Sequence, residues 1–448
     1  MTETKIFTTG RQTFKDEILD KISPSFCLAK WYEATMWLYM GETASCHHNP
    51  THRIKLDPND LSSLHNTDVK LHERRRMLRG EQPNGCAYCW NAEKFGQISD
   101  RVLKSYSYRD LIVTDQTPPP MSVVPLRLEI AFSRTCNLAC SYCGPGFSSS
   151  WAKDIKNNGS YDLISTTRFN RDIKEKVLEE DNNQYVDAFL KWWPDLCKTL
   201  QVIRFTGGEP LLHKKFWEFL DLMDDTFQGS LYVNSNLIHH KGQVEKFIEK
   251  TKHLWEQEKV EIHTSCESNL KQAEFTRDGF DGELWYQNVE NILRDSKIRL
   301  TITTAVNNIS VWSYIDYLKM VNSLKEKYGN NRIDMNANRV IHPEFHQIQL
   351  IPLNYRLELA EEIENELPKL KNLSDTRSQT HIQNLTKFLR ESEWRKLHEK
   401  GGHPFLNQDQ LSIEKDMITF YDEFRKRRNK TEEHLDPRFL KWIASLRV

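Results

Sequence analysis

The sequence lacks any run of about 18 consecutive apolar residues, roughly the length that a membrane-spanning helix needs. Its mean hydropathy is −0.67, and we expect no membrane partner. It also lacks an excess of charge of either sign, because 62 Lys and Arg residues face 63 Asp and Glu residues, for a formal net charge of −1. That balance disfavours a protein that binds nucleic acid by charge alone. Residues 1–20 have neither the apolar core of a secretory signal nor the character of a transit peptide, so the expected location is the cytoplasm.

Cysteine is scarce in most of the chain. Only Cys197 and Cys266 follow Cys143, whereas the other seven of the nine cysteines lie between Cys27 and Cys143. An odd number of cysteines in a chain of 448 residues disfavours a disulfide scaffold and favours metal ligation or redox work. Cys197 and Cys266 have no partner at ligand spacing, and we expect both to be small buried residues.

The order of the apolar segments predicts an α/β protein of three parts. The run Pro118 to Pro120 is a stiff linker that ends a first domain, 1–118. From 121 to 352, β-type runs alternate with amphipathic helical stretches, which is typical of a parallel α/β domain with its active groups at the carboxyl ends of the strands. The expected strands are 126–132, 201–206, 230–235, 259–264, 298–306 and 332–341. About six strands indicate a partial, TIM-like barrel rather than a closed barrel of eight.

Two further segments complete this prediction. The crossover that follows the first barrel strand opens with the polar stretch 144–160, which we expect to be a lid or substrate loop rather than a packed element. Residues 353–448 carry charged amphipathic patterns and are expected to form a C-terminal helical extension.

Three cysteines follow the first barrel strand at the spacing Cys136-x3-Cys140-x2-Cys143. Thiolates on one short loop can hold three irons of a 4Fe-4S cluster and leave the fourth iron open as a binding position. Zinc is the alternative, although it usually takes a fourth protein ligand from a second paired hook, and none is adjacent.

This loop, with Tyr142 just before its last cysteine, resembles the C-x3-C-x-aromatic-C pattern of the radical S-adenosylmethionine (radical SAM) superfamily. The resemblance implies a partial (β/α)6 barrel and an oxidoreductase whose open iron chelates S-adenosylmethionine. One electron from the cluster would then cleave the cosubstrate to a 5′-deoxyadenosyl radical. It also implies an external electron donor such as flavodoxin or ferredoxin.

Other positions resemble cosubstrate contacts of the same family. They are Gly207, Gly208 and Glu209 of a GGEP motif, Asn234 and Asn236 after the third strand, Ser265 and Glu267 after the fourth, Arg277, and Asn307 after the fifth. The resemblance implies that Glu209 takes the methionine amino group and that Arg277 contacts a carboxylate. Each of these residues also has an alternative as an ordinary turn former at the end of a strand.

A second set of cysteines, here called the N-terminal cysteine set, comprises Cys27, Cys46, Cys86 and Cys89. Its arrangement, with an aromatic strand and a Gly-x4-Cys between hooks, resembles the twitch and SPASM modules of radical SAM enzymes and implies one auxiliary 4Fe-4S cluster. Two departures are that the set precedes the barrel and that the extra cysteines of a full SPASM module are missing. Zinc stays open as an alternative, as does ligation by His47 or His48.

The basic run His72 to Arg79 could hold a phosphate or nucleic acid, but we expect a helix with a solvated basic face. The leading hypothesis is an oxidative radical SAM enzyme, with a peptide or protein as its preferred substrate class. The alternatives are a dehydrogenase of a small molecule or a nucleotide-related substrate, and a zinc-bearing, non-enzymatic binding module on an α/β body.

Overall fold

A computed structural model describes residues 10–111, 117–164, 177–178, 182–240, 242–391 and 410–447. The chain forms two compact units. The first unit comprises 1–133, 177–205 and 221–230, and the second comprises 134–176, 206–220 and 231–448. Among the described residues, no helix has both the length and the apolar character to cross a membrane.

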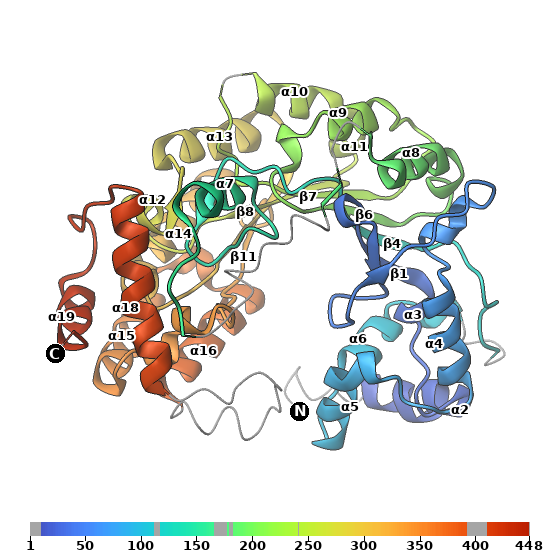
Figure 1. Ribbon diagram of the computed structural model, residues 1–448, viewed down its shortest axis with the longest axis horizontal. Coiled ribbons are helices and arrows are strands. Elements are labelled where there is room, and N and C mark those ends of the chain that lie inside the picture. The colour runs from blue at the N-terminus through green and yellow to red at the C-terminus, as the bar shows by residue number, and fades with distance from the viewer. Residues whose placement is uncertain are drawn as a thin grey trace. The chain divides into compact units, whose positions relative to one another are not determined.

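The first unit is built on strands in the order β6-β4-β1-β2-β3 (Figure 1). Their bounds are β1 (Glu33–Trp37), β2 (Glu42–Ala44), β3 (His52–Arg53), β4 (Arg127–Ala131) and β6 (Val202–Phe205). β1 pairs in parallel with β4, which pairs in parallel with β6, while β2 and β3 are antiparallel additions. The aromatic strand of the N-terminal segment therefore pairs directly with the expected first barrel strand. The limits 1–118, 121–352 and 353–448 stay a prediction of domain organisation.

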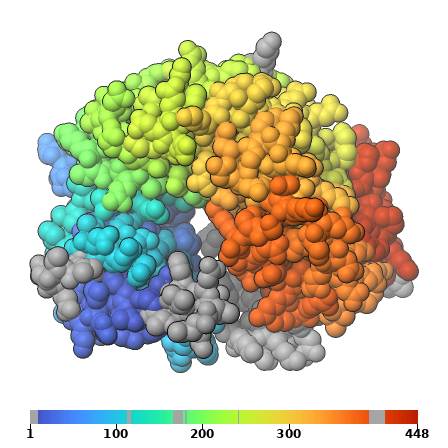
Figure 2. All heavy atoms as spheres, turned by 180° about the vertical axis from the view of Figure 1, so that it is seen from behind, coloured from blue at the N-terminus to red at the C-terminus, as the bar shows by residue number. Residues whose placement is uncertain are grey.

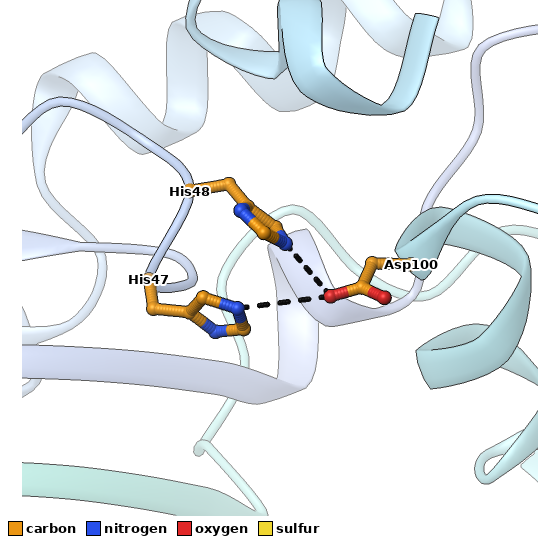
Figure 3. Close-up of side chains that lie close together, drawn as sticks. All are labelled: His47, His48 and Asp100. Carbon is orange, nitrogen blue, oxygen red and sulfur yellow. Dashed lines mark hydrogen bonds and ion pairs between the residues drawn. The ribbon is translucent and has the colours of Figure 1, made fainter. Parts of the chain in front are cut away.

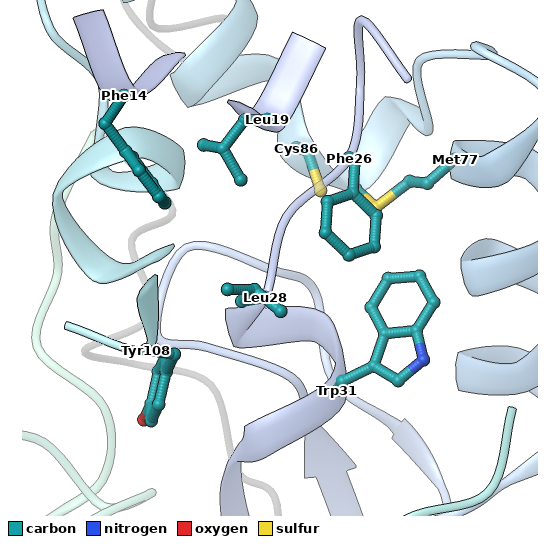
Figure 4. Packing of buried hydrophobic residues seen from close by; sticks show 8 residues of the cluster. All are labelled: Phe14, Leu19, Phe26, Leu28, Trp31, Met77, Cys86 and Tyr108. Carbon is teal, nitrogen blue, oxygen red and sulfur yellow. The ribbon is translucent and has the colours of Figure 1, made fainter. Parts of the chain in front are cut away.

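Helices of the first unit enclose an apolar core of their own (Figure 4). They include α3 (Ala29–Tyr32), α4 (Asp68–Leu78), α5 (Ala87–Lys94) and α6 (Asp100–Tyr106), while α8 (Gln184–Leu196) also belongs to the first unit. The core consists of Phe14, Leu19, Phe26, Leu28, Trp31, Met77, Cys86 and Tyr108. Because Cys86 belongs to this core, one thiol of the N-terminal cysteine set is anchored by ordinary apolar packing.

Residues 72–78 belong to α4 and Arg79 caps its end, as the sequence predicts, but the basic side chains are not all solvated. The Thr67 side chain caps α4 by accepting a hydrogen bond from the Lys70 backbone N–H. Arg74 is fully buried and donates to the carbonyl oxygens of Lys30 and Met121. The prediction of a solvated face is therefore wrong for Arg74, because buried backbone carbonyls of neighbouring segments need its donors.

The second unit contains parallel strands in the order β11-β10-β8-β7. Their bounds are β7 (Ser230–Asn234), β8 (Val260–Ser265), β10 (Arg299–Thr303) and β11 (Ile333–Met335). Helices alternate with them, among them α10 (Gln243–Lys250), α12 (Leu270–Thr276), α13 (Gly282–Asp295) and α14 (Tyr314–Tyr328). The prediction of an α/β protein is confirmed, and the partial barrel stays a prediction.

The described parts of 353–448 are helical. They contain α15 (Leu353–Glu366), α16 (Thr376–Arg390), α18 (Gln410–Arg427) and α19 (Pro437–Ser445). The Asp375 and Asp436 side chains cap α16 and α19 by accepting from backbone N–H groups. α15 and α16 contribute to the orange part of the surface in Figure 2.

Candidate functional site

The segment 134–143, here called the cysteine loop, carries Cys136, Cys140 and Cys143 as free thiols. Cys140 ends β5 (Ala139–Cys140) and pairs in antiparallel register with Arg277 of β9 (Arg277–Asp278). The Ser141 N–H donates to the Thr276 carbonyl at 2.7 Å, and the Cys143 N–H donates to the Cys140 carbonyl at 2.9 Å. Backbone hydrogen bonds on both sides of Cys140 therefore fix the loop.

The segment after the cysteine loop is a packed support, so the prediction of a lid at 144–160 is wrong for α7 (Ser149–Asn158). The Ser148 hydroxyl caps α7 and also donates to the Leu138 carbonyl at 2.7 Å. Trp151 is fully buried, and its indole N–H donates to the Cys140 carbonyl at 2.8 Å. The polar residues of this stretch hydrogen-bond to loop backbone rather than to water, which is why composition alone misassigned them.

The end of helix α18 packs against this support. The Arg428 guanidinium, just beyond α18, lies 4.3 Å from the centre of the Trp151 ring. Arg427 at the end of α18 forms an ion pair of 3.2 Å with Asp154 of α7. The described end of the C-terminal extension therefore contributes to the stability of the cysteine loop.

The GGEP segment lies against the backbone of the cysteine loop. Gly207 has a φ of 109°, which disfavours any residue with a side chain. A Cβ atom on Gly208 would lie 2.2 Å from the Thr135 carbonyl oxygen and 2.5 Å from that of Arg134. The Glu209 N–H donates to the Thr135 carbonyl at 2.7 Å. The structure therefore brings the predicted GGEP motif and the predicted cysteine loop together.

Glu209 is held as a buried carboxylate. It accepts hydrogen bonds from the Ser235 hydroxyl at 2.9 Å and from the Asn236 backbone N–H at 2.6 Å. His239 Nε2 lies 3.2 Å from the Glu209 carboxylate, and both side chains are fully buried. The Asn236 side-chain amide donates to Asn137 Oδ1 at 2.8 Å and lies 3.9 Å from the Cys136 sulfur. Glu209 and Asn236 thus share a network with the cysteine loop.

Tyr142, Glu267 and Arg277 form a buried cluster beside Cys140. The Arg277 guanidinium donates to the Glu267 carboxylate at 3.1 Å and to the Tyr142 hydroxyl, which also donates to Glu267 at 3.2 Å. Burial raises the pKa of Glu267, and the Arg277 charge opposes that shift. The buried Arg277 Nε has no hydrogen-bond partner among the described residues. That nitrogen is the donor left for a ligand carboxylate, so the cluster fits the implied cosubstrate.

The remaining predicted cosubstrate residues, Asn234, Ser265 and Asn307, make no hydrogen bond to the cysteine loop among the residues that the structure describes. Asn234 and Ser265 stand at the carboxyl ends of β7 and β8, as the sequence predicts. The fully buried Asn307 accepts from the Ile309 and Ser310 backbone N–H groups and donates to the Ala305 carbonyl. Its amide therefore serves the local turn, and a contact of Asn307 with the cosubstrate stays a prediction.

Reasoning from sequence missed His346, which supports the cysteine loop from another segment. Its Nε2 lies 3.1 Å from the Ser141 carbonyl oxygen, to which the N–H of a neutral ring donates. Burial lowers the pKa of His346 to about 3, so the ring is neutral near physiological pH. No local sequence signal connects a histidine to a loop 205 residues earlier in the chain.

The four cysteines of the N-terminal cysteine set line one pocket. Cys27 precedes α3, Cys46 follows β2, Cys86 lies just before α5, and Cys89 lies within it. Burial raises the pKa of the Cys27 and Cys89 thiols to about 12, and neighbouring sulfurs add to the shift. A metal group bound there would have to displace these protons. The structure thus brings all four predicted ligands together.

Three cationic side chains also line this pocket. They are far apart in the sequence, and no local pattern predicted that they would lie beside the cysteines. Lys30 pairs with Glu73, Lys104 pairs with Glu33 at 2.6 Å, and Arg101 pairs with Glu93 at 2.8 Å. Positive charge near thiolates favours their deprotonated form. Each of these cations is paired with a carboxylate, so the charge that it offers to a thiolate is partly offset.

The sulfur spacing bears on the choice between zinc and iron. Around one zinc ion, thiolate sulfurs at about 2.3 Å from the metal lie about 3.8 Å apart. In the part of the chain that the structure describes, the ligand atoms that all lie within 4.8 Å of one another are those of His47, His48 and Asp100, not three sulfurs of either cysteine set. Zinc and a cluster therefore both stay open for the N-terminal cysteine set.

No protein-family model matches the chain, and no curated protein matches it. A solved structure described as TYW1 with a lysine–pyruvate adduct bound is similar to it at 16% sequence identity. The similarity covers 54% of this chain and 70% of that chain, with a TM-score of 0.27. A likeness of this size establishes neither fold nor function, so the functional proposal depends on this chain's own residues.

Proposed function

We propose that the protein is a radical SAM enzyme that reductively cleaves S-adenosylmethionine to a 5′-deoxyadenosyl radical and oxidatively modifies an organic substrate. The observation that carries this proposal is the contact between the cysteine loop and the GGEP segment. The loop that carries three thiols packs against this segment, where Gly208 lies too close to the loop backbone for any side chain, and a buried carboxylate follows directly. Each half of this arrangement is ordinary alone, and their contact is specific.

In this proposal Cys136, Cys140 and Cys143 hold a 4Fe-4S cluster, which supplies an electron and an open iron for the cosubstrate when bound. The chain's own residues bind and orient the cosubstrate. The Glu209 carboxylate, fixed by Ser235 and Asn236, would accept hydrogen bonds from the methionine ammonium. The free Arg277 Nε would donate to the methionine carboxylate.

We further propose that the N-terminal cysteine set would hold an auxiliary 4Fe-4S cluster, which would supply an acceptor for the electron of the substrate radical left by hydrogen abstraction. The shared pocket of the four thiols supports a metal group at this site, and the resemblance to the twitch module favours a cluster over zinc. An external donor such as flavodoxin or ferredoxin would reduce the first cluster. The proposed substrate class is a peptide or protein, with a small molecule or a nucleotide-related compound as the alternative.

Anaerobic iron and sulfide analysis with a cleavage assay tests the proposal. About eight irons per chain would fit two clusters, about four would remove the auxiliary cluster, and none after reconstitution would refute the enzyme. Replacing Cys136, Cys140 and Cys143 together by Ala should abolish formation of 5′-deoxyadenosine. Cys197→Ala is the matched control, because this buried cysteine has no role in either set. Unchanged cleavage in the triple variant would exclude the assignment. A colourless protein with stoichiometric zinc would favour the binding module instead.

A further inference from the structure

His47 and His48 lie together with Asp100 beside the N-terminal cysteine set (Figure 3). His48 Nε2 lies 2.7 Å and His47 Nε2 lies 3.7 Å from the same Asp100 carboxylate oxygen. The ligand atoms of all three residues lie within 4.8 Å of one another. We propose that these three residues bind one divalent transition-metal ion of the zinc class, separately from both cysteine sets.

The backbone accounts for this convergence. Side chains of adjacent residues diverge in a regular strand, because they point to opposite faces. After β2 the chain instead turns, and the Asn49 N–H closes the turn on the Cys46 carbonyl at 3.2 Å. The two rings lie on the same side of this turn, with their centres 4.0 Å apart. Asp100 is brought to them as the first residue of α6.

The site is also held rigid by its neighbours. The His48 ring stacks on Tyr88 of α5, with ring centres 3.8 Å apart and planes 14° from parallel. This contact fixes the ring while its Nε2 points at Asp100. The nearby cation Lys104 is paired with Glu33 at 2.6 Å, so its charge is offset and opposes a bound cation less.

The donor set selects the class of metal. Two imidazoles and one carboxylate suit zinc and its transition-metal neighbours, whereas calcium and magnesium prefer oxygen ligands. Zinc takes nitrogen at about 2.0–2.1 Å and carboxylate oxygen at about 2.0–2.2 Å, which places tetrahedral ligand atoms about 3.3 Å apart. The two distances to Asp100, 2.7 Å and 3.7 Å, lie on either side of that value. Three protein ligands leave one position open to water or a substrate group, as in catalytic zinc sites.

The site shares two of its three residues with the wall of the cysteine pocket, and its third residue lies outside that wall. His48 and Asp100 line that pocket, but His47 does not. His47 is also the most exposed of the three, at 56% of its side chain, so an ion can reach it from solvent. The inference does not depend on the proposed enzymatic function.

Zinc bound to the iron-loaded protein tests the site directly. The protein is dialysed against Zn²⁺, and zinc and iron are measured together with the zinc X-ray absorption spectrum. We expect one zinc per chain beyond the iron, with nitrogen and oxygen neighbours at about 2.0–2.1 Å and no sulfur neighbour at about 2.3 Å. His47→Ala and Asp100→Asn should each weaken zinc binding by about tenfold or more, because even outer-sphere partners of a metal contribute that much.

Several outcomes decide the question. His47 is exposed and Asp100→Asn keeps the shape of the side chain, so both variants should fold, and circular dichroism checks this. The matched control is His72→Ala, an exposed histidine of α4 outside the site, which should bind zinc as the wild type does. No retained zinc, zinc with sulfur neighbours, or unchanged binding in both variants would overturn the site. Iron lost together with zinc in the His47 variant would show that the histidines serve the cysteine set, which also overturns it.

Discussion

The Trp151 indole N–H donates a hydrogen bond of 2.8 Å to the carbonyl oxygen of Cys140, the central cysteine of the cysteine loop. Trp151→Phe keeps the buried ring and removes this donor. The Cys140 carbonyl then keeps only the Cys143 N–H as its donor, and the loss of one hydrogen bond costs about 0.5–1.5 kcal/mol. We expect the variant to fold but to lose iron faster to a chelator than the wild type, because Cys140 is then held less firmly.

The control for this variant is Trp255→Phe. Trp255 ends α11 (Lys252–Trp255), and its indole N–H donates to the Ile248 carbonyl of α10 at 2.7 Å rather than to the cysteine loop. It should lose thermal stability without faster iron loss. Equal rates of iron loss in the two variants would show that α7 does not support the loop.

Gly208 permits the contact on which the proposed function depends. In Gly208→Ala the new Cβ would lie 2.2 Å from the Thr135 carbonyl, so the backbone has to shift. We expect reduced iron content and at least a marked loss of 5′-deoxyadenosine formation, measured after anaerobic reconstitution. Gly10→Ala, where the added atom would meet only Tyr106 at 3.9 Å, should leave both unchanged. Wild-type cleavage by Gly208→Ala would contradict the close approach.

The sequence predicted the cysteine loop and the GGEP segment because their signals are local. The spacing of cysteines on a single loop determines which sulfurs can bind one cluster. The turns that follow parallel strands meet at the same edge of the sheet, so the positions of the strand ends determine which turns lie together. The prediction for 144–160 failed for the opposite reason. The polar composition of this segment predicted a solvated loop. In the structure, however, Ser148 and Trp151 donate hydrogen bonds to the carbonyls of Leu138 and Cys140.

Long-range pairing accounts for the other differences. Nothing in the segment 31–40 indicates that β1 pairs in parallel with β4, whose residues come more than 90 positions later, with Glu33 opposite Arg127. Similarly, Arg74 looks like part of a basic surface run, and only the fold shows that buried carbonyls need its donors. Such partners are far apart in the sequence, so no local pattern encodes them.

Glu267 and Arg277 make a buried ion pair whose removal should affect stability as well as cosubstrate binding. Arg277→Ala leaves a fully buried carboxylate without its cation, which costs about 3–5 kcal/mol. The double variant Glu267→Gln, Arg277→Met should recover much of that loss in urea unfolding while cosubstrate affinity stays low. Wild-type affinity in the double variant would show that Arg277 is structural only.

Because of His52, we expect the stability of the first unit toward unfolding to fall at acidic pH. Its Nε2 lies 2.8 Å from the Thr67 hydroxyl, and burial, then the Lys70 charge, lowers its pKa from 6.5 to about 4. The folded state therefore binds fewer protons than the unfolded state between these values, so stability falls as the pH drops from 6.5 to about 4. Urea unfolding across this range should show a shallower decline for His52→Gln than for the wild type. His72→Gln, at an exposed position, should keep the wild-type slope.

Removing two ligands from the N-terminal cysteine set should separate cosubstrate cleavage from substrate oxidation. Cys86→Ala, Cys89→Ala leaves the cysteine loop untouched. We expect about four irons per chain and normal 5′-deoxyadenosine formation in a single turnover with dithionite. Substrate oxidation should stall, because the carbon radical left by hydrogen abstraction needs an electron acceptor.

A structural zinc at the same four sulfurs leads to a different result. Structural metal binding contributes folding free energy directly, so loss of the ligands would unfold the first unit. The apolar core around Cys86, which includes Phe26 and Met77, remains in the double variant and should keep it folded if the group is an electron-transfer cluster. Circular dichroism and solubility are therefore measured beside turnover. A folded variant that still oxidises the substrate fully would exclude an electron-transfer role. An unfolded variant, together with a wild-type protein that holds no iron at this set, would favour zinc.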